Sequence, residues 1–425
     1  MPDNLGIYIH IPFCASKCSY CDFYSLAGKD NLMDDYFDAL LLHLKESAPQ
    51  ISKYTVDTVY FGGGTPSYFG ADRIVDIFNF LKLNGNVRVD SEVTVEVNPD
   101  STSYTALKLM RDEGINRLSI GVQSANSDIL KIIGRRHSYE QAVRTIEDAR
   151  RAGFDNISLD LIYGLPTQTR EDWAESLARA VSLHPEHISC YGLTLEPGTP
   201  MYKNYKDSPM LPDDDTQADM YCYAVEMLKR YGYEQYEVSN FCARGFESRH
   251  NLKYWNLEDY MGFGPGAHSY VDSVRYSYVR DLKNYISGVR NPNAVIVDEY
   301  GKIEPLERAV EYIMLGMRTS RGISEYDYHV KCKCDWRPIL ATLELFASKG
   351  WAERSDEGRW HFTVPGFLIS NTLINIMLEA QATGRVESVP WIKEALADME
   401  KTEIPLTDDE AFIEIYKQRI SGKKL

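Results

Sequence analysis

Three cysteines near the start of the chain, Cys14, Cys18 and Cys21, form a C-x3-C-x2-C pattern with no fourth cysteine nearby. A four-iron cube takes one thiolate per iron, so three protein thiolates leave one iron open for a ligand that is not protein. The spacing therefore predicts a 4Fe-4S cluster that is kept reduced and has one iron available for chemistry.

A zinc site completed by His10 or another residue is the alternative, because sites built from three cysteines and one histidine are common for zinc. Zinc ribbons usually present paired C-x2-C knuckles, however, and a catalytic zinc rarely takes three closely spaced thiolates from one loop. The spacing of the three cysteines therefore favours the cluster.

S-adenosylmethionine can fill the open iron through its amino and carboxylate groups, and an electron from the cluster can then break the sulfonium and release an adenosyl radical. Two segments have residues suited to such a ligand. Gly62-Gly-Gly-Thr-Pro66 lets the backbone approach a ligand closely, although a tight turn after a strand needs the same glycines. Glu96 can accept hydrogen bonds from ribose hydroxyls, or it can be a solvated charge at a loop mouth.

Gln123, Arg135 and Asp160 can likewise bind the ribose, carboxylate and adenine edges of the ligand. Asp160 is the most informative of the three, because it lies inside the apolar run Leu-Asp-Leu-Ile-Tyr. A carboxylate buried in such a strand costs several kcal/mol unless it is paired or hydrogen-bonded. We therefore expect Asp160 to have a specific role.

Short runs of β-branched and aromatic residues alternate with amphipathic stretches along the first half of the chain. The predicted strands are residues 5–11, 56–61, 93–97, 117–122, 157–162 and 187–191. The predicted helices are residues 32–48, 71–83, 102–113, 138–152 and 170–183, with Asp72, Ser101 and Thr169 as N-caps. This alternation predicts an α/β fold in which right-handed crossovers curl six parallel units into a barrel or an open partial barrel. The polar candidates would then lie together at the C-terminal ends of the strands.

The pattern changes beyond the sixth predicted strand, which divides the chain into four segments. They are a core with the cluster loop (1–240), a connecting segment (241–302), a mostly helical, winged-helix-like domain (303–385) and a helical acidic tail (386–425). Within them, residues 216–231, 305–319, 336–349 and 366–379 are predicted helices, and 233–241 and the run from Trp360 are predicted strands. Cys332 and Cys334 are expected on a surface loop, and Cys190, Cys222 and Cys242 as ordinary buried thiols.

Composition excludes some classes of protein and favours others. The formal net charge of −16 disfavours nonspecific binding of nucleic acid, which needs clustered Lys and Arg. The first residues lack the basic and apolar regions of a signal peptide, and no stretch is long enough to span a membrane. Eight cysteines, three of them in one loop, fit the reducing cytoplasm better than a disulfide framework.

These motifs together resemble the radical S-adenosylmethionine superfamily and, within it, the oxygen-independent coproporphyrinogen III oxidase family. The resemblance rests on the cysteine loop, Gly-Gly-Gly-Thr-Pro, Glu96-Val-Asn-Pro, Gly121-Val-Gln and Asp160-Leu-Ile-Tyr-Gly-Leu-Pro, and it extends to Leu315-Gly-Met-Arg and Pro365-Gly-Phe-Leu. It implies a partial (β/α)6 radical-SAM barrel followed by a mostly helical, winged-helix-like domain. It also implies that the ligand contacts Tyr8, Tyr20, Gly63, Gly64, Thr65, Glu96, Gln123, Arg135, Asp160 and Gly192, with Tyr20 against the adenine.

Three features distinguish the chain from the coproporphyrinogen dehydrogenases of that family. Those enzymes typically have a further cysteine where this chain has Phe23, and a longer segment before the cluster than residues 1–13. His250-Asn-Leu-Lys-Tyr-Trp255 resembles the H-N-x-x-Y-W signature of HemW-type haem chaperones. An imidazole can ligate haem iron while Tyr254 and Trp255 pack on the macrocycle, and His268 is a second candidate ligand. A histidine beside aromatic residues can equally be a hydrogen-bonded core residue.

The resemblance therefore implies a haem chaperone that binds haem, carries a 4Fe-4S cluster with S-adenosylmethionine, and passes haem to an acceptor protein. It would also need an electron donor for the cluster. The alternatives are the coproporphyrinogen III dehydrogenase, which turns propionates into vinyl groups by a radical route, and a radical methyltransferase that opens haem. No residue is assigned a catalytic role.

Overall fold

Six parallel strands form the centre of the fold in a computed structural model that describes residues 3–384. They are neighbours in chain order, namely β1 (Asn4–Ile11), β4 (Thr55–Gly63), β5 (Val87–Val97), β6 (Arg117–Gln123), β7 (Ile157–Tyr163) and β8 (His187–Gly192). The predicted α/β partial barrel is thus confirmed, with strand ends that differ by a few residues. The predicted acidic tail, residues 386–425, lies outside the described residues.

Side chains on these strands alternate between an apolar outer face and a polar inner face, as the period of two requires. Tyr8 and His10 on β1 lie opposite Tyr60 and Gly62 on β4, and they point into the barrel. The residues between them, such as Ile9, belong to the main hydrophobic core under the helices. The interior of the barrel therefore carries polar side chains from its first strand onward. The interior of a packed barrel is usually filled by bulky apolar side chains.

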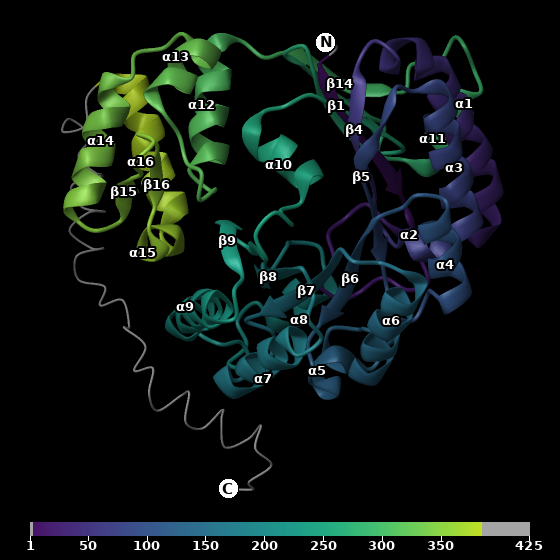
Figure 1. Cartoon of the computed structure of the whole chain (residues 1–425), viewed down its shortest axis with the longest axis horizontal. Helices are drawn as coiled ribbons and strands as arrows, with labels where there is room; N and C mark the ends of the chain where they lie inside the picture. The colour runs from purple at the N-terminus through teal and green to yellow at the C-terminus, as the bar shows by residue number, and fades with distance from the viewer. Residues whose placement is uncertain (1–2, 385–425) are drawn as a thin grey trace, which may run out of the picture.

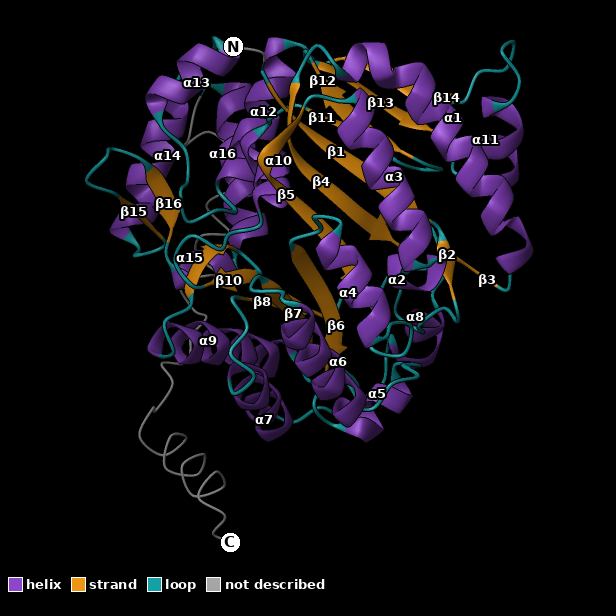
Figure 2. Ribbon diagram, turned by 45° about the vertical axis from the view of Figure 1, so that its right-hand side comes forward, coloured by secondary structure: helices purple, strands orange, loops and turns teal. Residues whose placement is uncertain are grey.

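Helices cover the outside of the strand arc, and Figure 1 and Figure 2 show them wrapped around its convex face. They are α1 (Met33–Ile51), α3 (Ala71–Asn84), α4 (Tyr104–Asp112), α6 (Tyr139–Ala152) and α7 (Arg170–Val181). The predicted N-cap Thr169 is confirmed, because its side chain accepts a hydrogen bond from the amide of Asp172. The other two predicted caps are wrong: α3 follows Gly70, so Asp72 lies inside its first turn, and Ser103 rather than Ser101 caps α4.

Further strands extend the sheet to twelve without closing it. On the β1 side lie β11 (Tyr260–Phe263), β12 (His268–Val271), β13 (Val274–Tyr278) and β14 (Val297–Lys302); on the β8 side lie β10 (Asn240–Cys242) and β9 (Glu234–Glu237). The single strand predicted for 233–241 is wrong, because the chain reverses after Glu237 and pairs with itself in an antiparallel manner. Since β9 and β14 are opposite edges, the barrel stays open between them.

Three helices belong to this second half of the sheet: α9 (Asp214–Arg230), α10 (Arg249–Asn256) and α11 (Leu282–Val289). In Figure 1, α10 lies on the concave side of the strand arc while α9 and α11 lie outside it. A helix on the concave side, such as α10, can fill one end of the barrel. Its position therefore decides which of its side chains are buried and which reach the cavity.

The C-terminal segment has a hydrophobic core of its own, which includes Trp336, Phe346 and Met377. Its elements are α12 (Pro305–Gly316), α13 (Glu325–Cys332), α14 (Arg337–Ser348), β15 (Ala352–Arg354), β16 (Trp360–Phe362), α15 (Val364–Leu368) and α16 (Ser370–Thr383). The sequence pattern did not predict α13. The expected surface loop is also wrong for Cys332, which is buried at the end of that helix. The winged-helix-like interpretation and the four-segment division stay predictions.

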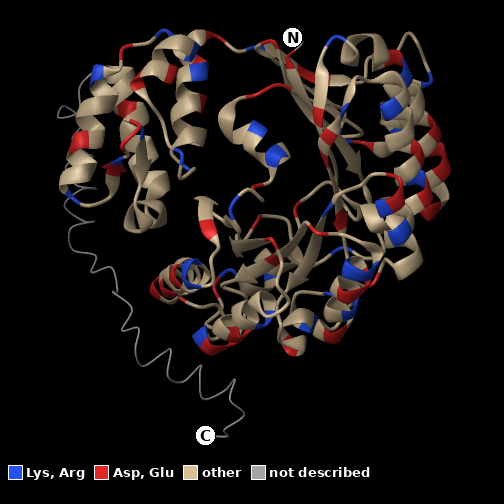
Figure 3. Cartoon of the chain, in the orientation of Figure 1, with Lys and Arg blue, Asp and Glu red and all other residues tan. Residues whose placement is uncertain are grey.

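In the view of Figure 3, Lys and Arg are interspersed with Asp and Glu along the described part of the chain. The first turn of α1 carries Asp34 and Asp35, and that of α9 carries Asp214 and Asp215. Among residues 3–384, no helix combines the length and the apolar composition needed to cross a membrane.

His43 on α1 joins the outer helices to the added strands. Its Nδ1 lies 2.7 Å from the Tyr285 hydroxyl and its Nε2 lies 3.1 Å from the Tyr278 hydroxyl. Burial lowers the pKa of His43 from 6.5 to about 4, so the folded protein keeps the ring neutral.

We expect the stabilisation from His43 to depend on pH. The unfolded chain protonates this imidazole below pH 6.5 and the folded chain resists until about pH 4, so the contribution is complete above pH 6.5 and is lost as the pH falls. The difference in unfolding free energy between wild type and His43→Gln should shrink by about 3 kcal/mol between pH 7 and pH 4. Chemical denaturation at both pH values measures it, with His329→Gln, an exposed histidine on α13, as the control. A difference that does not change with pH would contradict the assignment.

Candidate functional site

A cavity of about 1130 Å³ opens at the C-terminal ends of the parallel strands. Its lining includes every predicted cluster and S-adenosylmethionine residue, namely Tyr8, Cys14, Cys18, Tyr20, Cys21, Gly63, Gly64, Thr65, Glu96, Gln123, Arg135, Asp160 and Gly192. His250 is absent from this lining, whereas His268 is part of it. Pockets for one drug-sized ligand are typically ~300–1,000 Å³, so this cavity has room for more than one small molecule.

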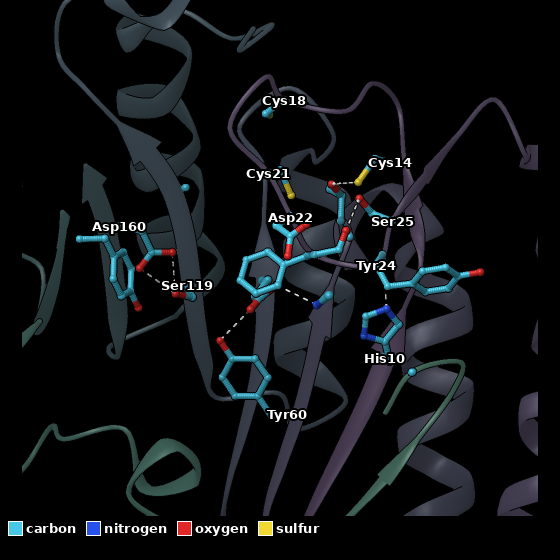
Figure 4. A pocket seen from close by; sticks show the side chains of 18 of the residues that line it. His10, Cys14, Cys18, Cys21, Asp22, Tyr24, Ser25, Tyr60, Ser119 and Asp160 are labelled. Carbon is cyan, nitrogen blue, oxygen red and sulfur yellow. Dashed lines mark hydrogen bonds between the residues drawn. The ribbon is translucent and has the colours of Figure 1, made fainter. Parts of the chain in front are cut away.

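The cysteine loop is held in place by its backbone. Cys14 ends the short strand β2 (Phe13–Cys14), which pairs with β3 (Leu26–Ala27). Between them, the amide of Ser19 donates to the carbonyl of Ile133 at 3.1 Å, and the amide of Met201 donates to the carbonyl of Ser19 at 2.8 Å. The loop is thus fixed against α5 (Ser127–Ile132) and α8 (Pro200–Tyr205). Figure 4 shows the three labelled cysteines together on this loop above the strand ends.

The two metal hypotheses require different arrangements of the ligands. Across residues 3–384, no three His, Cys, Asp or Glu side chains converge closely enough to hold one metal ion. A zinc ion needs such convergence because its sulfur ligands lie at about 2.3 Å, whereas a four-iron cube keeps each thiolate on its own iron. The cluster assignment rests on the C-x3-C-x2-C spacing of these cysteines.

His10, the fourth ligand of the zinc alternative, has no free nitrogen. Its Nε2 lies 2.8 Å from the carbonyl of Tyr24, which can only accept, so Nε2 carries the proton. Its Nδ1, 3.1 Å from the Tyr8 hydroxyl, must therefore accept. Burial lowers the pKa of His10 to about 4, which keeps this neutral form. Figure 4 shows the hydrogen bond between the ring and Tyr24.

The end of β4 approaches the cysteine loop so closely that only glycine fits. A Cβ on Gly64 would lie 2.7 Å from the carbonyl oxygen of Phe13 and 3.1 Å from the sulfur of Cys14. The amides of Gly64 and Thr65 donate to the carbonyls of Ile11 and Phe13, both at 2.8 Å, and the Thr65 hydroxyl donates to Cys14 Sγ at 3.4 Å. The glycine motif therefore connects the strand end directly to the cluster loop.

Glu96 supports the same turn from the neighbouring strand β5. One carboxylate oxygen accepts from the hydroxyl of Tyr60 at 3.0 Å and the other from the amide of Gly63 at 3.1 Å. Burial raises the pKa of Glu96 to about 7, against the lowering effect of these hydrogen bonds. Gly63 itself has φ +114°, a conformation that glycine adopts without strain.

Arg135 connects the loop to the strand ends through a short polar network. Its guanidinium donates to the hydroxyl of Tyr20 and to the side-chain carbonyl of Asn98, both at 2.7 Å. Asn98 in turn donates to the Thr65 hydroxyl at 3.3 Å. The sequence analysis missed Asn98, although it lies in the quoted Glu-Val-Asn-Pro motif. Within the described residues the Arg135 Nε is buried and has no hydrogen-bond partner.

Gln123 is held in a strained backbone conformation at the end of β6. Its φ is +66°, which costs a residue other than glycine roughly 1–2 kcal/mol. The pairing of β6 with β7 shifts register between Gly121 and Gln123, and this bulge turns the side chain toward the cavity. A Cβ on Gly121 would lie 2.8 Å from Nε2 of the Gln123 side chain. The absence of a side chain at Gly121 therefore leaves room for the Gln123 side chain.

Asp160 lies on β7 among hydroxyl groups rather than opposite a single cation. Its carboxylate accepts from Ser119 at 3.0 and 3.1 Å and from Ser189 at 2.8 Å, and Figure 4 shows the Ser119 contact. Burial raises the pKa of Asp160, while the serine hydroxyls and the more distant Arg117 lower it. The hydroxyls offset the cost of a carboxylate in an apolar strand.

Arg117, at the start of β6, is a cavity residue that the sequence analysis missed. It is 2% exposed. Burial alone would lower its pKa, but the negative charge of Glu92 and neighbouring groups raises it. A charged residue at the head of an apolar strand is the same signal that identified Asp160, and it could have been used here.

His250, one of the two candidate haem ligands, is not among the residues that line the cavity. The ring is fully buried; its Nδ1 lies 2.8 Å from the Thr58 hydroxyl and its Nε2 lies 2.8 Å from the Tyr254 hydroxyl. The two oxygens of Glu92 accept the amides of Arg249 and His250, each at 3.0 Å, and hold the start of α10 under the barrel. Burial lowers the pKa of His250 to about 3.

The partial barrel, the loop of three cysteines and the glycine turn beside it define a radical S-adenosylmethionine protein. Residues 8–180 match the family model of the radical SAM superfamily. The heme chaperone HemW of Bacillus subtilis is 35% identical over 377 residues, which cover 87% of this chain and 98% of that protein. HemW of Escherichia coli is 33% identical over 382 residues, covering 88% and 98%. The chain belongs to the HemW family of this superfamily.

The solved structure of coproporphyrinogen III oxidase (HemN) from Escherichia coli, described as a radical SAM enzyme, has the same fold. Its TM-score is 0.77 at 24% identity, over 88% of this chain and 90% of that one. Membership of the superfamily implies a 4Fe-4S cluster and S-adenosylmethionine, and the cavity described above has the residues for both.

Replacing Cys14, Cys18 or Cys21 with Ala should remove the cluster, since each thiolate serves a separate iron. Iron and sulfide in the anaerobically reconstituted variants should fall to near background. Cys334→Ala, in the C-terminal core, is the matched control and should reconstitute like wild type. A cavity-cysteine variant with full iron and sulfide content would refute the assignment.

Gly64→Ala should damage the site although it removes none of the three cysteine ligands of the cluster. The added methyl group collides with two backbone carbonyls and a cysteine sulfur, so the loop must move away from β4. We expect most of the reconstituted iron to be lost and S-adenosylmethionine to bind at least about tenfold more weakly by calorimetry. Gly301→Ala on β14, where a Cβ meets nothing within 4 Å, should match wild type. Equal behaviour of the two variants would show that the close approach is unimportant.

Proposed function

We propose that this protein is a haem chaperone that binds haem and, with its 4Fe-4S cluster and S-adenosylmethionine, delivers haem to acceptor proteins. The observation that carries the proposal is the similarity, over nearly the whole chain, to relatives named heme chaperone HemW. Phe23 adds support, because the dehydrogenases typically have a cysteine there. This phenylalanine is 71% exposed beside the cluster loop and offers no thiol.

The proposed cluster ligands are Cys14, Cys18 and Cys21, which leave one iron for the amino and carboxylate groups of S-adenosylmethionine. When bound, the cluster would supply the electron that cleaves the sulfonium. Gly63, Gly64 and Thr65 would bind the methionine amino group, and Glu96 the ribose hydroxyls. Tyr20 would cover the adenine, and the remaining contacts would come from Tyr8, Gln123, Arg135, Asp160 and Gly192.

The cavity supports a flat second ligand as well. Beyond the proposed S-adenosylmethionine residues its lining continues to Tyr24, Tyr191 and Tyr260, and to His268 and Arg280. Aromatic rings pack on a macrocycle, imidazole ligates iron, and guanidinium pairs with carboxylates. These are the residue types that haem requires.

Two protein partners belong to the proposal, an acceptor of haem and an electron donor for the cluster. We place the protein in the reducing cytoplasm, since the cluster must be kept reduced and the eight cysteines form no disulfide framework in the described residues. The exposed Phe23 and Lys17 on the cluster loop are suited to a docking donor.

The alternative is the coproporphyrinogen III dehydrogenase, and the fold shared with HemN is the specific observation in its favour. An anaerobic assay of the reconstituted protein with S-adenosylmethionine, a strong reductant and coproporphyrinogen III separates the two functions. The masses of the porphyrin products are measured, and the stoichiometry of haem binding is measured on the same preparation.

We expect haem to bind with its mass unchanged and coproporphyrinogen III to stay unconverted. The control is S-adenosylmethionine cleavage by the same sample, which shows that its cluster works. Formation of the divinyl product would make the protein the dehydrogenase, and a methylated, opened haem would make it the methyltransferase.

A further inference from the structure

We propose that β14 is a docking edge, to which an extended, basic segment of a partner protein adds as a further strand beside the cavity. This inference goes beyond the proposed function, which leaves the protein partners unidentified. It rests on the open edge itself, on the exposed apolar side chains along it and on its negative charge.

β14 is the edge of the sheet that the chain leaves open. It pairs with β13 on one side and has no strand on the other within residues 3–384. The opposite edge, β9, is covered by the segment after α12, where the amide of Ser320 donates to the carbonyl of Tyr236 at 3.0 Å. An open edge presents a row of unpaired N–H and C=O groups that can hydrogen-bond another strand.

The backbone of β14 is anchored at both ends, so this row of groups is preformed. The amide of Ile303 donates to the carbonyl of Ser273 at 2.8 Å. At the other end, the amide of Val279 donates to the carbonyl of Ile296 at 2.9 Å. Residues in an antiparallel pair alternate between those bonded to the partner strand and those whose amides point away from it. Counting back from Ile303 in this alternation, the amide of Tyr300 points to the open edge.

Large apolar side chains are exposed along the same stretch. Val295 is 80% exposed, Tyr300 75% and Leu306 62%. All six residues of β14 are exposed, so both faces of the strand are open to solvent. Charged residues can protect an edge from unwanted pairing, but such protection does not require exposed valine and tyrosine side chains. These side chains are suited to the alternating contacts that an added strand makes.

The charge of this stretch indicates the chemistry of the partner. Between Val295 and Glu307 there is one cation, Lys302, and there are four acidic residues, namely Asp298, Glu299, Glu304 and Glu307. Asp298 and Glu299 also line the cavity, which places the added strand beside it. Opposite charges that face each other across a strand pair stabilise it, whereas like charges destabilise it. The partner segment is therefore basic, with lysine or arginine opposite the acidic residues.

The test uses the full-length, cluster-reconstituted protein and a fluorescent synthetic peptide in which lysine alternates with valine. Binding is measured by fluorescence anisotropy, and hydrogen–deuterium exchange of residues 297–302 is measured with and without the peptide. A matched peptide with glutamate in place of lysine tests the charge. A second matched peptide, N-methylated along its backbone, keeps the charge but has no amide hydrogens to donate to β14.

The protein variants remove either the charge of β14 or one of its amides. The double variant Asp298→Lys and Glu299→Lys reverses the charge. Its matched control is the same reversal of another adjacent acidic pair, Asp214 and Asp215 in the first turn of α9. Tyr300→Pro removes an amide at the open edge, where a strand tolerates proline, and Tyr300→Ala keeps that amide.

We expect the basic peptide to bind the wild-type protein and to slow exchange in residues 297–302, because the added strand pairs with the amides at the open edge. Charge reversal on β14 and Tyr300→Pro should each weaken binding at least about tenfold. The α9 control and Tyr300→Ala should bind within about threefold of wild type. The acidic and the N-methylated peptides should not bind.

Wild-type protein that does not bind the basic peptide would overturn the inference. Equal binding of the N-methylated peptide would reduce the contact to charge attraction and overturn the added strand; this comparison decides if Tyr300→Pro fails to fold. Unchanged affinity in both the charge-reversal variant and Tyr300→Pro would place the peptide elsewhere, with the same consequence. A wild-type dimer in sedimentation that Tyr300→Pro converts to a monomer would show that a second copy of the chain occupies the edge, and would also overturn the inference.

Discussion

The close approach of the β4 end to the cysteine loop is the contact on which the rest of the site depends. Gly64 has no room for a methyl group because the carbonyls of the loop and the sulfur of Cys14 occupy the space. Hydrogen bonds from Gly64 and Thr65 then fix the loop to the parallel sheet. Glu96 and the network from Arg135 to Asn98 hold the turn from the neighbouring strands. These contacts hold the three thiols above the rim of the barrel.

A polar barrel interior is the second constraint, and it has an energetic cost that the structure offsets by pairing. Arg117 and Asp160 are charged groups in the wall, and hydroxyls or opposite charges face each of them. Below them, α10 closes the barrel with its amides on Glu92 and with Lys253 2.8 Å from Asp57. Buried charge pairs of this kind add little net stability, because the cost of desolvating the charges offsets their attraction. The helix that carries His250 is therefore part of the scaffold, and its histidine completes a hydrogen-bonded floor.

The open edge of the sheet gives the cavity its mouth. Beyond β1 the arc continues through β11, which pairs with β1 in parallel, and then through β12, β13 and β14, which pair in an antiparallel manner. These strands bring His268 and Arg280 to the same rim as the cluster loop. Residues from the two ends of the sheet thus surround one volume large enough for S-adenosylmethionine and a flat macrocycle. The architecture shared with HemN accounts for a common cavity in proteins with different roles, since fold alone does not fix function.

The sequence by itself determined the six parallel strands, the cluster cysteines and the rim at which the polar residues meet. These follow from local periodicity and from the rule that the C-terminal ends of parallel strands share one edge. Only the tertiary structure decided which histidine reaches the cavity, because the residue types at His250 and His268 are equivalent and their burial depends on where α10 packs. Tertiary contacts also determine the reversal of the chain after Glu237 and the burial of Cys332. Local sequence patterns do not contain such contacts.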